Sequence, residues 1–180
     1  FPPMVGGIFY EHGHRMVAAF VGLLTLILAI WTVLKENRAW VRWLSIGALL
    51  AVIIQGILGG LTVLFLLPTP ISVSHAMLAQ TFYCLIVSLT LFTSPDWKLG
   101  LPQISDSSRK RSLRWLCAIT TTTVYLQLLL GALMRHTQSG LAIPDFPLAF
   151  GSIIPPFDSS NVAIHFAHRA GALLVTTMIA

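Results

Sequence analysis

Five apolar segments of membrane length dominate the chain and limit what it can fold into. Apolar runs of about 20 residues are typical of transmembrane helices. Only 9% of the residues are charged, whereas soluble domains carry about a quarter. We therefore expect an all-α integral membrane protein, an antiparallel transmembrane helix bundle with five spans. The expected helices are residues 11–34, 41–67, 74–92, 112–134 and 161–180.

Proline and serine predict where the second helix ends and the third begins. The second helix is expected to stop at Pro68-Thr69-Pro70, since proline cannot continue a helix. Ser72 or Ser74 is the expected N-cap of the third helix. The linker between the two helices, residues 68–73, is short, so we expect them to be antiparallel neighbours.

The basic residues lie in alternate loops, and this distribution matters more than the net charge of +5. Alternating basic loops follow the positive-inside rule of membrane proteins, so these residues set topology and do not indicate nucleic-acid binding. The loops at 68–73 and 135–163 are then expected on the outer side. The basic residues that define the inner loops are Lys35, Arg38, Arg42, Lys98, Arg109, Lys110, Arg111 and Arg114.

Every histidine lies at a helix end expected on the outer side. Ionisable groups at membrane depth are rare and usually functional. Two of these helix ends, which we call the first and the second mouth, repeat one pattern. The first mouth reads Glu11-His12-Gly13-His14-Arg15 and the second His165-Phe166-Ala167-His168-Arg169, which indicates that one structural unit occurs twice. The two remaining histidines are His75 and His136.

His14 and His75 are expected at the same depth on two helices of the first half. Two imidazoles facing each other across a bundle can hold a haem iron. Another metal, or histidines bonded to loop carbonyls, are the alternatives. A closed zinc site needs four ligands, and a di-iron site needs further carboxylates that this chain does not offer.

Three charged residues at these mouths have two interpretations each. Arg15 and Arg169 can reach the lipid headgroups, or their guanidinium groups can pair with haem propionates. Glu11 can stabilise the start of its helix, or it can exchange protons beside a cofactor. Glu11 aligns with His165 in the repeat, so the two mouths differ at this position.

Glycines and cysteines inside the apolar segments are interpreted as packing residues. The segments Gln55–Leu61 and Gln127–Leu133 resemble each other, and their small residues let helices approach closely. Cys84 and Cys117 lie in apolar runs, where small core residues are expected in preference to a disulfide or a metal pair.

The mouths together with an outer loop resemble the haem A synthase family. The similarity rests on the Glu-x-x-His-Arg start of the first helix, His75, the His-x-x-His-Arg start of the last helix, and Gly-Leu-x-x-Pro-Asp-x-Pro at 140–147. It covers essentially the whole chain and implies eight membrane helices in two similar four-helix halves. The chain would then hold helices two to six: a first-half bundle at 1–97, an inside linker at 98–112 and a second-half bundle at 113–180.

The resemblance also implies an activity, the oxidation of the haem o methyl group to the formyl group of haem a. It implies that His14 and His75 are the axial pair for the substrate haem and that Glu11 is the acidic residue of the reaction. His168 would be one axial ligand of a haem b, with its partner in the eighth helix. Some family members carry a cysteine pair in their outer loops, and the loop at 135–163 has none.

The implied location is the bacterial plasma membrane or the mitochondrial inner membrane. The implied partners are the lipid bilayer, haem o, an electron donor that the sequence does not identify, and the enzyme that supplies haem o. Two other functions compete with this one. A non-catalytic di-haem cytochrome would not need Glu11, and a haem transporter would need more polar residues at mid-membrane than Gln55, Gln127 and threonines.

Overall fold

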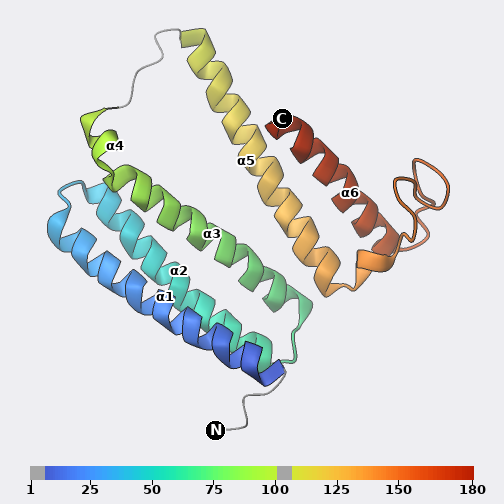
Figure 1. Ribbon diagram of the computed structural model, residues 1–180, viewed down its shortest axis with the longest axis horizontal. Coiled ribbons are helices and arrows are strands. Elements are labelled where there is room, and N and C mark those ends of the chain that lie inside the picture. Colours follow the sequence, from blue (N-terminus) through green and yellow to red (C-terminus); the bar gives the residue numbers. More distant parts are fainter. Residues whose placement is uncertain (1–6, 101–106) are drawn as a thin grey trace. The chain divides into compact units, whose positions relative to one another are not determined.

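The computed structural model describes residues 7–100 and 107–180 (Figure 1). In these residues it contains helices and no strand, which confirms the all-α prediction. Residues 101–106, within the predicted linker 98–112, and the N-terminal Phe1-Pro2-Pro3 lie outside the described residues. The elements are α1 (Gly7–Lys35), α2 (Ala39–Leu64), α3 (Thr69–Thr93), α4 (Pro95–Leu99), α5 (Ser107–His136), the 3-10 turn η1 (Ser139–Leu141) and α6 (Ser160–Ile179).

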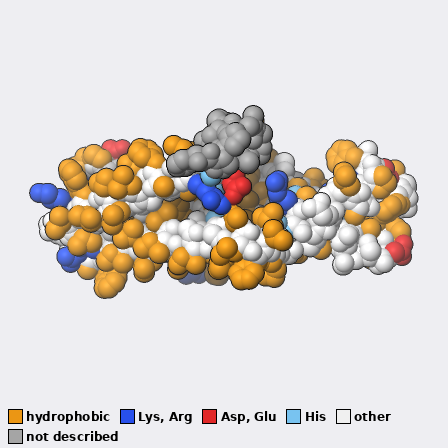
Figure 2. All heavy atoms as spheres, turned by 90° about the horizontal axis from the view of Figure 1, so that it is seen from below, with side chains coloured by type: hydrophobic (Ala, Val, Ile, Leu, Met, Phe, Trp, Pro, Cys, Tyr) orange, Lys and Arg blue, Asp and Glu red, His pale blue; other side chains and the backbone are white. Residues whose placement is uncertain are grey.

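Five of the described helices, α1, α2, α3, α5 and α6, are long and apolar enough to cross a membrane. The five predicted spans are therefore confirmed, and the chain is an integral membrane protein. Figure 2 shows one face of the molecule, on which hydrophobic side chains are widespread and charged ones few. Cys84 and Cys117 are free thiols, but both are exposed, so their predicted place in the core is wrong. On membrane helices, apolar residues face outward as readily as inward, since lipid is as apolar as the protein interior.

The chain divides into two compact units that share α3. The first unit holds α1, α2, α4 and the part of α3 from Leu78 onward. The second unit holds the segment Leu67–Met77 together with α5, η1 and α6. The two pseudo-symmetric four-helix halves stay a prediction.

The turn between α2 and α3 is tighter than the proline pattern predicted. α2 ends at Leu64, and Leu66 and Leu67 adopt left-handed φ angles of 56° and 62°. α3 then begins at Thr69, so the prediction that Ser72 or Ser74 caps it is wrong. Pro70 is tolerated in the first turn because a helix has no internal partner there for its missing N–H. Ser72 lies inside the helix and is 4% exposed.

The first unit is held together by small apolar contacts in the membrane segments. α1 packs on α2, and α2 meets α3 through a cluster that centres on Val41, Ala48 and Leu89. Small side chains let membrane helices approach closely, and dispersion forces then hold them together.

The end of the first unit that carries Glu36 is tied by charge and by aromatic rings. The Glu36 carboxylate accepts hydrogen bonds from the Arg38 backbone N–H and guanidinium, which lowers the pKa of Glu36 to about 2. The same guanidinium donates to the Phe92 carbonyl at 2.8 Å. The Phe92 ring meets Trp40 and Trp97 edge to face, at centroid distances of 5.0 and 4.8 Å. These contacts fix the α1–α2 turn against the end of α3.

The short helix α4 at this end was not predicted. Ser94 caps it by accepting a hydrogen bond from the Trp97 N–H, and Pro95 occupies the first turn. The helix has five residues, too few for a helical repeat of apolar residues to be recognised in the sequence.

Candidate functional site

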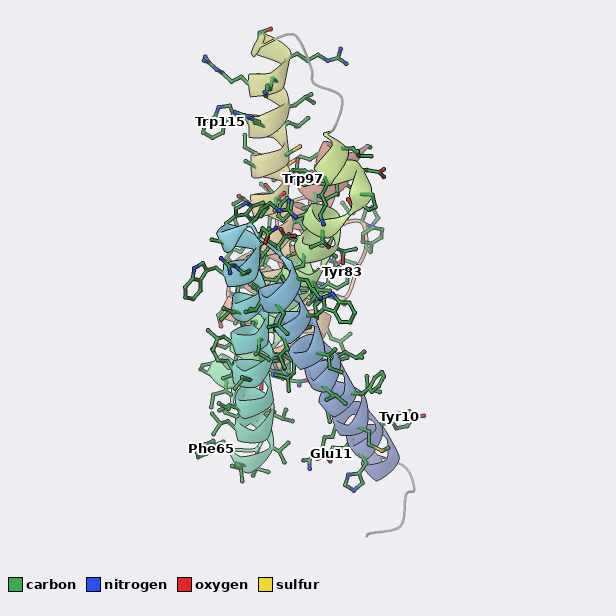
Figure 3. All side chains as sticks on the ribbon, turned by 90° about the vertical axis from the view of Figure 1, so that its left-hand side faces the viewer. Tyr10, Glu11, Phe65, Tyr83, Trp97 and Trp115 are labelled. Atoms are coloured by element: carbon green, nitrogen blue, oxygen red, sulfur yellow. The ribbon has the colours of Figure 1, made fainter. Side chains whose placement is uncertain are left out.

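The mouth of α1 carries an ion pair one helical turn long. Arg15 donates to Glu11 Oε1 at 2.7 Å, and both side chains are about half exposed. His14 is exposed beside them, and His12 is partly buried. Figure 3 shows Glu11 and Phe65 at the same end of the α1–α2 pair, where the two helices diverge. The described residues of this mouth therefore place a carboxylate, a guanidinium group and an imidazole at one helix end.

His75 lies in the second unit, on the first turns of α3. This segment is tied to α5 at two points: the Tyr125 hydroxyl donates to the Met77 carbonyl, and the Thr69 hydroxyl donates to the His136 carbonyl, both at 3.3 Å. His14 belongs to the other unit. The axial pairing of His14 with His75 thus stays a prediction.

The mouth of α6 is covered by a loop that folds around one carboxylate. Asp145 accepts hydrogen bonds from the backbone N–H groups of Phe150 and Gly151 at 2.7 and 2.8 Å. These two residues form the tip of a tight turn with φ angles of 55° and 75°, which Gly151 adopts without steric cost. Ala149 and Ser152 close the turn by reciprocal backbone hydrogen bonds. The Asp145 carboxylate thereby holds the shape of the loop.

Below the turn, the loop is anchored in a small apolar core. Ile143 and Ala149 from the loop are buried against Val162 at the start of α6. Phe157 meets Phe166 edge to face at 5.7 Å. The loop is thus part of the packed structure of the second unit.

Acid should loosen the Asp145 turn. The two backbone hydrogen bonds, together with nearby Arg169, hold the pKa of Asp145 below its usual value of 3.8. A carboxyl group with a lowered pKa in the folded protein stabilises the fold above that usual value, and its contribution is lost as the pH falls through the lowered value. Hydrogen exchange at the Phe150 and Gly151 amides should lose protection, corrected for intrinsic rates, as the pH drops below about 3.8.

The matched control for this prediction is Asp158, an exposed carboxylate of the same loop. Asp145→Asn should remove the acid-dependent step, because the amide cannot ionise, whereas Asp158→Asn should keep it. Equal acid sensitivity in both variants would show that Asp145 does not control the turn.

Arg169 is the centre of the second mouth. Its NH1 donates to the carbonyls of Asp145 and Leu148 at 2.7 and 3.1 Å, and its NH2 donates to the Ile143 carbonyl at 3.2 Å. The guanidinium also lies 5.7 Å from the Phe146 ring centroid. A planar fork of five N–H donors can satisfy several carbonyls at once, which a lysine cannot do. Arg169 therefore fastens the loop to α6.

His165 serves the same loop. It is 7% exposed, and its Nδ1 accepts a hydrogen bond from the Ile143 N–H at 3.1 Å. Its Nε2 lies 3.1 Å from the Arg169 Nε. Both ring nitrogens thus face protein groups, and the hydrogen bond at Nδ1 makes His165 a support of the loop.

His168 faces α5, where small residues make room for it. The Gln127 amide nitrogen donates to the His168 carbonyl at 2.8 Å and lies 3.0 Å from the ring Nδ1. A Cβ atom on Gly131 would lie 3.0 Å from the ring Cε1, so a larger residue would crowd the imidazole. Packing was the expected role of this glycine, and for Gly131 it is confirmed. Gly56 and Gly60 of α2 have no such neighbour within 4 Å among the described residues.

Some of these roles were missed from the sequence. Asp145 was noted only as part of a motif, and Gln127 only as part of a repeat and as one of the few polar residues at mid-membrane. The i, i+4 spacing of His165 and Arg169 was the available signal, because residues four apart share a helix face. It indicates that the two act together, but it cannot show that a loop lies between them and the solvent.

The family model described as "Cytochrome oxidase assembly protein" (COX15-CtaA) matches residues 6–180. Three relatives named "Heme A synthase" come from Halalkalibacterium halodurans, Symbiobacterium thermophilum and Alkalihalophilus pseudofirmus, at 34%, 32% and 30% identity. Each alignment covers 94% of this chain and 56% of the relative, so the chain spans little more than half their length. The match covers every described residue and shows that the chain belongs to the cytochrome oxidase assembly protein family.

Proposed function

We propose that the protein is a haem A synthase, a membrane oxidoreductase that converts the methyl group of haem o into the formyl group of haem a. The family match over residues 6–180, with relatives that carry this name, is the observation that supports it most strongly. The helix mouths offer the histidine, arginine and carboxylate side chains that such a site would need.

The second mouth fits a resident haem b. The half-buried His168 has its Nδ1 beside Gln127, so Nε2 is the ring nitrogen that would bind the iron, and Gly131 makes room for the ring against α5. A bound haem would supply electron transfer there. Arg169 would bind a propionate, for which it must exchange at least one loop carbonyl for a propionate oxygen. His165 and Asp145 would keep the loop closed and exclude water.

The first mouth would bind haem o as substrate. His14 and His75 would hold its iron, and Arg15 would pair with a propionate. Glu11 would accept or return a proton near the reacting methyl group. Its ion pair with Arg15 at 2.7 Å directs the carboxylate along one face of the helix. Binding of a propionate by Arg15 would release Glu11 to act as a base.

The topology proposed for this function places both mouths on the outer side of the membrane. Lys110, Arg111 and Arg114 lie near the start of α5, and His136 lies at its end. Basic residues favour the inner side, so the histidine end of this helix would face outward. The lipid bilayer, a separate electron donor and the enzyme that supplies haem o are the proposed partners, in a bacterial plasma membrane or mitochondrial inner membrane.

The alternative is a di-haem membrane cytochrome that only carries electrons. Glu11 favours the enzyme, because an electron carrier has no need of a carboxylate at one haem and not at the other. The second mouth has His165 at the corresponding position, and there it supports the loop.

Analysis of extracted haems distinguishes the two functions. We expect the full-length protein, produced in cells that make haem o, to yield hydroxylated and formylated haem by chromatography. His75→Ala should abolish these products and one haem spectrum while leaving the haem spectrum of the second mouth. Two bound haems without any oxidised haem o would support the cytochrome. Loss of both spectra in His75→Ala would contradict two separate sites.

A further inference from the structure

The first turns of α5, at the end of the helix opposite His136, carry a shallow groove that the proposed haem sites do not use. The groove has a volume of about 540 Å³ and is lined by Lys110, Arg111, Arg114, Trp115 and Ala118. All five side chains are exposed. An α-helix turns by about 100° per residue, so these positions share one face about 140° wide. Three cations and one indole ring are thus gathered on one side of α5.

The charge pattern of α5 places this groove at the level of the lipid headgroups. Residues 115–134 contain no charged side chain, and as a helix they are about 30 Å long, which is about the thickness of the hydrocarbon core. Arg114 then lies at the edge of the hydrocarbon, with Lys110 one turn further out. Trp115 is 65% exposed and projects from α5 (Figure 3), at the boundary where indole rings concentrate in membrane proteins.

The three cations of the groove are not neutralised within the part of the chain that the structure describes. There, Lys110, Arg111 and Arg114 take part in no ion pair, whereas Arg15 and Arg38 each have a carboxylate partner. Cations spaced i, i+3 and i, i+4 repel each other. The first turn of α5 has no acidic residue, although the start of a helix favours negative charge. An anion from outside the chain would relieve both effects.

We propose that this groove binds the phosphate of an anionic phospholipid. Lys110, Arg111 and Arg114 would contact the phosphate oxygens, while Trp115 and Ala118 would lie along the first part of an acyl chain. A free phosphate has the same charge but no acyl chain for the apolar side of the groove, so the lipid is favoured. The topology proposed above places this lipid in the inner leaflet. The inference goes beyond the haem chemistry and does not depend on it.

Setting the topology of the membrane helices is the simpler role for these residues, and the two roles make different demands. The positive-inside rule counts basic residues near the end of a span, whichever face of the helix they occupy. A lipid site depends on the face. Arg109 has the same charge as Arg111 and Arg114, but it does not line the groove and lies about 100° beyond its edge at Lys110. It is therefore the matched control.

The first test measures how strongly the full-length protein retains added phosphatidylglycerol or phosphatidylcholine in detergent, by native mass spectrometry. The unmodified protein should retain phosphatidylglycerol more strongly. Lys110→Gln and Arg114→Gln should each weaken this retention about fivefold, the effect of one basic residue at an anionic membrane surface. Arg109→Gln should leave it unchanged. Equal retention of the two lipids, or equal losses in Arg109→Gln and Arg114→Gln, would overturn the inference, because only total charge would then matter.

The second test decides between a lipid, a free phosphate and a protein segment as the occupant of the groove. Sodium phosphate, added to the concentration of the lipid phosphate, should not displace phosphatidylglycerol from the unmodified protein. Displacement would show that the groove recognises phosphate alone and would refute the lipid.

Trp115 reports whether the lipid lies in the groove. In phosphatidylcholine nanodiscs, a minor fraction of phosphatidylglycerol with brominated acyl chains should quench tryptophan fluorescence more than the same fraction of brominated phosphatidylcholine. Trp115→Phe should remove this difference, as should Lys110→Gln combined with Arg114→Gln. A difference that persists in Trp115→Phe would place the lipid elsewhere. If neither brominated lipid quenches Trp115, a protein segment covers this face, and the inference fails.

Discussion

Glu11→Gln is expected to abolish haem a formation while both haems stay bound. Glutamine has the size of glutamate but cannot accept a proton near neutral pH, so only the proton-transfer step is lost. General acid–base groups contribute about 10²- to 10⁴-fold to a rate. Product haems from the full-length variant, separated by chromatography and normalised to bound haem, measure the loss.

Folding cannot account for a loss of that size. The substitution breaks the Glu11–Arg15 pair, whose side chains are about half exposed. Exposed pairs with i, i+4 spacing contribute about 0.3–0.5 kcal/mol, far too little to unfold the first unit. The melting temperature and the haem spectra should therefore be nearly unchanged.

The matched control is Glu36→Gln, the same chemical change just beyond the other end of α1. Glu36 binds Arg38 and has no place in the proposed reaction. This variant should retain haem a formation while losing stability, because the Arg38 guanidinium loses its partner. Equal activity in Glu11→Gln and Glu36→Gln would remove Glu11 from the reaction and restore the electron-carrier alternative.

The spans were predictable from the sequence because lipid enforces a simple pattern. A bilayer requires about 20 apolar residues per helix, and this pattern identified all five described spans. Helix ends were less predictable because they depend on local geometry. Thr69 begins α3 only because Leu66 and Leu67 turn the chain through left-handed conformations, which leucine propensity does not indicate.

The candidate site was predictable where one residue type carries the chemistry. Histidines at the helix mouths stand out in an apolar chain, and their spacing could be read directly. The division of roles between His165 and His168 could not, because it depends on partners far away in sequence. Ile143 reaches His165 across 22 residues, and Gln127 reaches His168 across 41. Sequence spacing alone places both histidines at the same helix end but does not identify the residues that they contact.

Arg169→Leu is expected to release the loop over the second mouth. The guanidinium holds the carbonyls of Ile143, Asp145 and Leu148, which would lose their donor together. Hydrogen bonds to charged groups contribute about 1.5–3 kcal/mol each, and they are not additive for one side chain. We expect a loss of about 2–4 kcal/mol in the local stability of the loop. Faster hydrogen exchange at Ile143, Phe150 and Gly151 would measure it.

The repeated motif supplies the matched control, because Arg15 follows His14 as Arg169 follows His168. Arg15 pairs with one exposed carboxylate, so Arg15→Leu should cost only a few tenths of a kcal/mol. Arg169→Lys should fall between, since a lysine keeps the charge but cannot reach three carbonyls in one plane. If Arg169→Leu left loop exchange unchanged, the apolar contacts of Ile143 and Ala149 with Val162 would suffice to hold the loop. Arg169 would then exchange a loop carbonyl for a haem propionate without loosening the loop, and the two arginines would have the same role at their mouths.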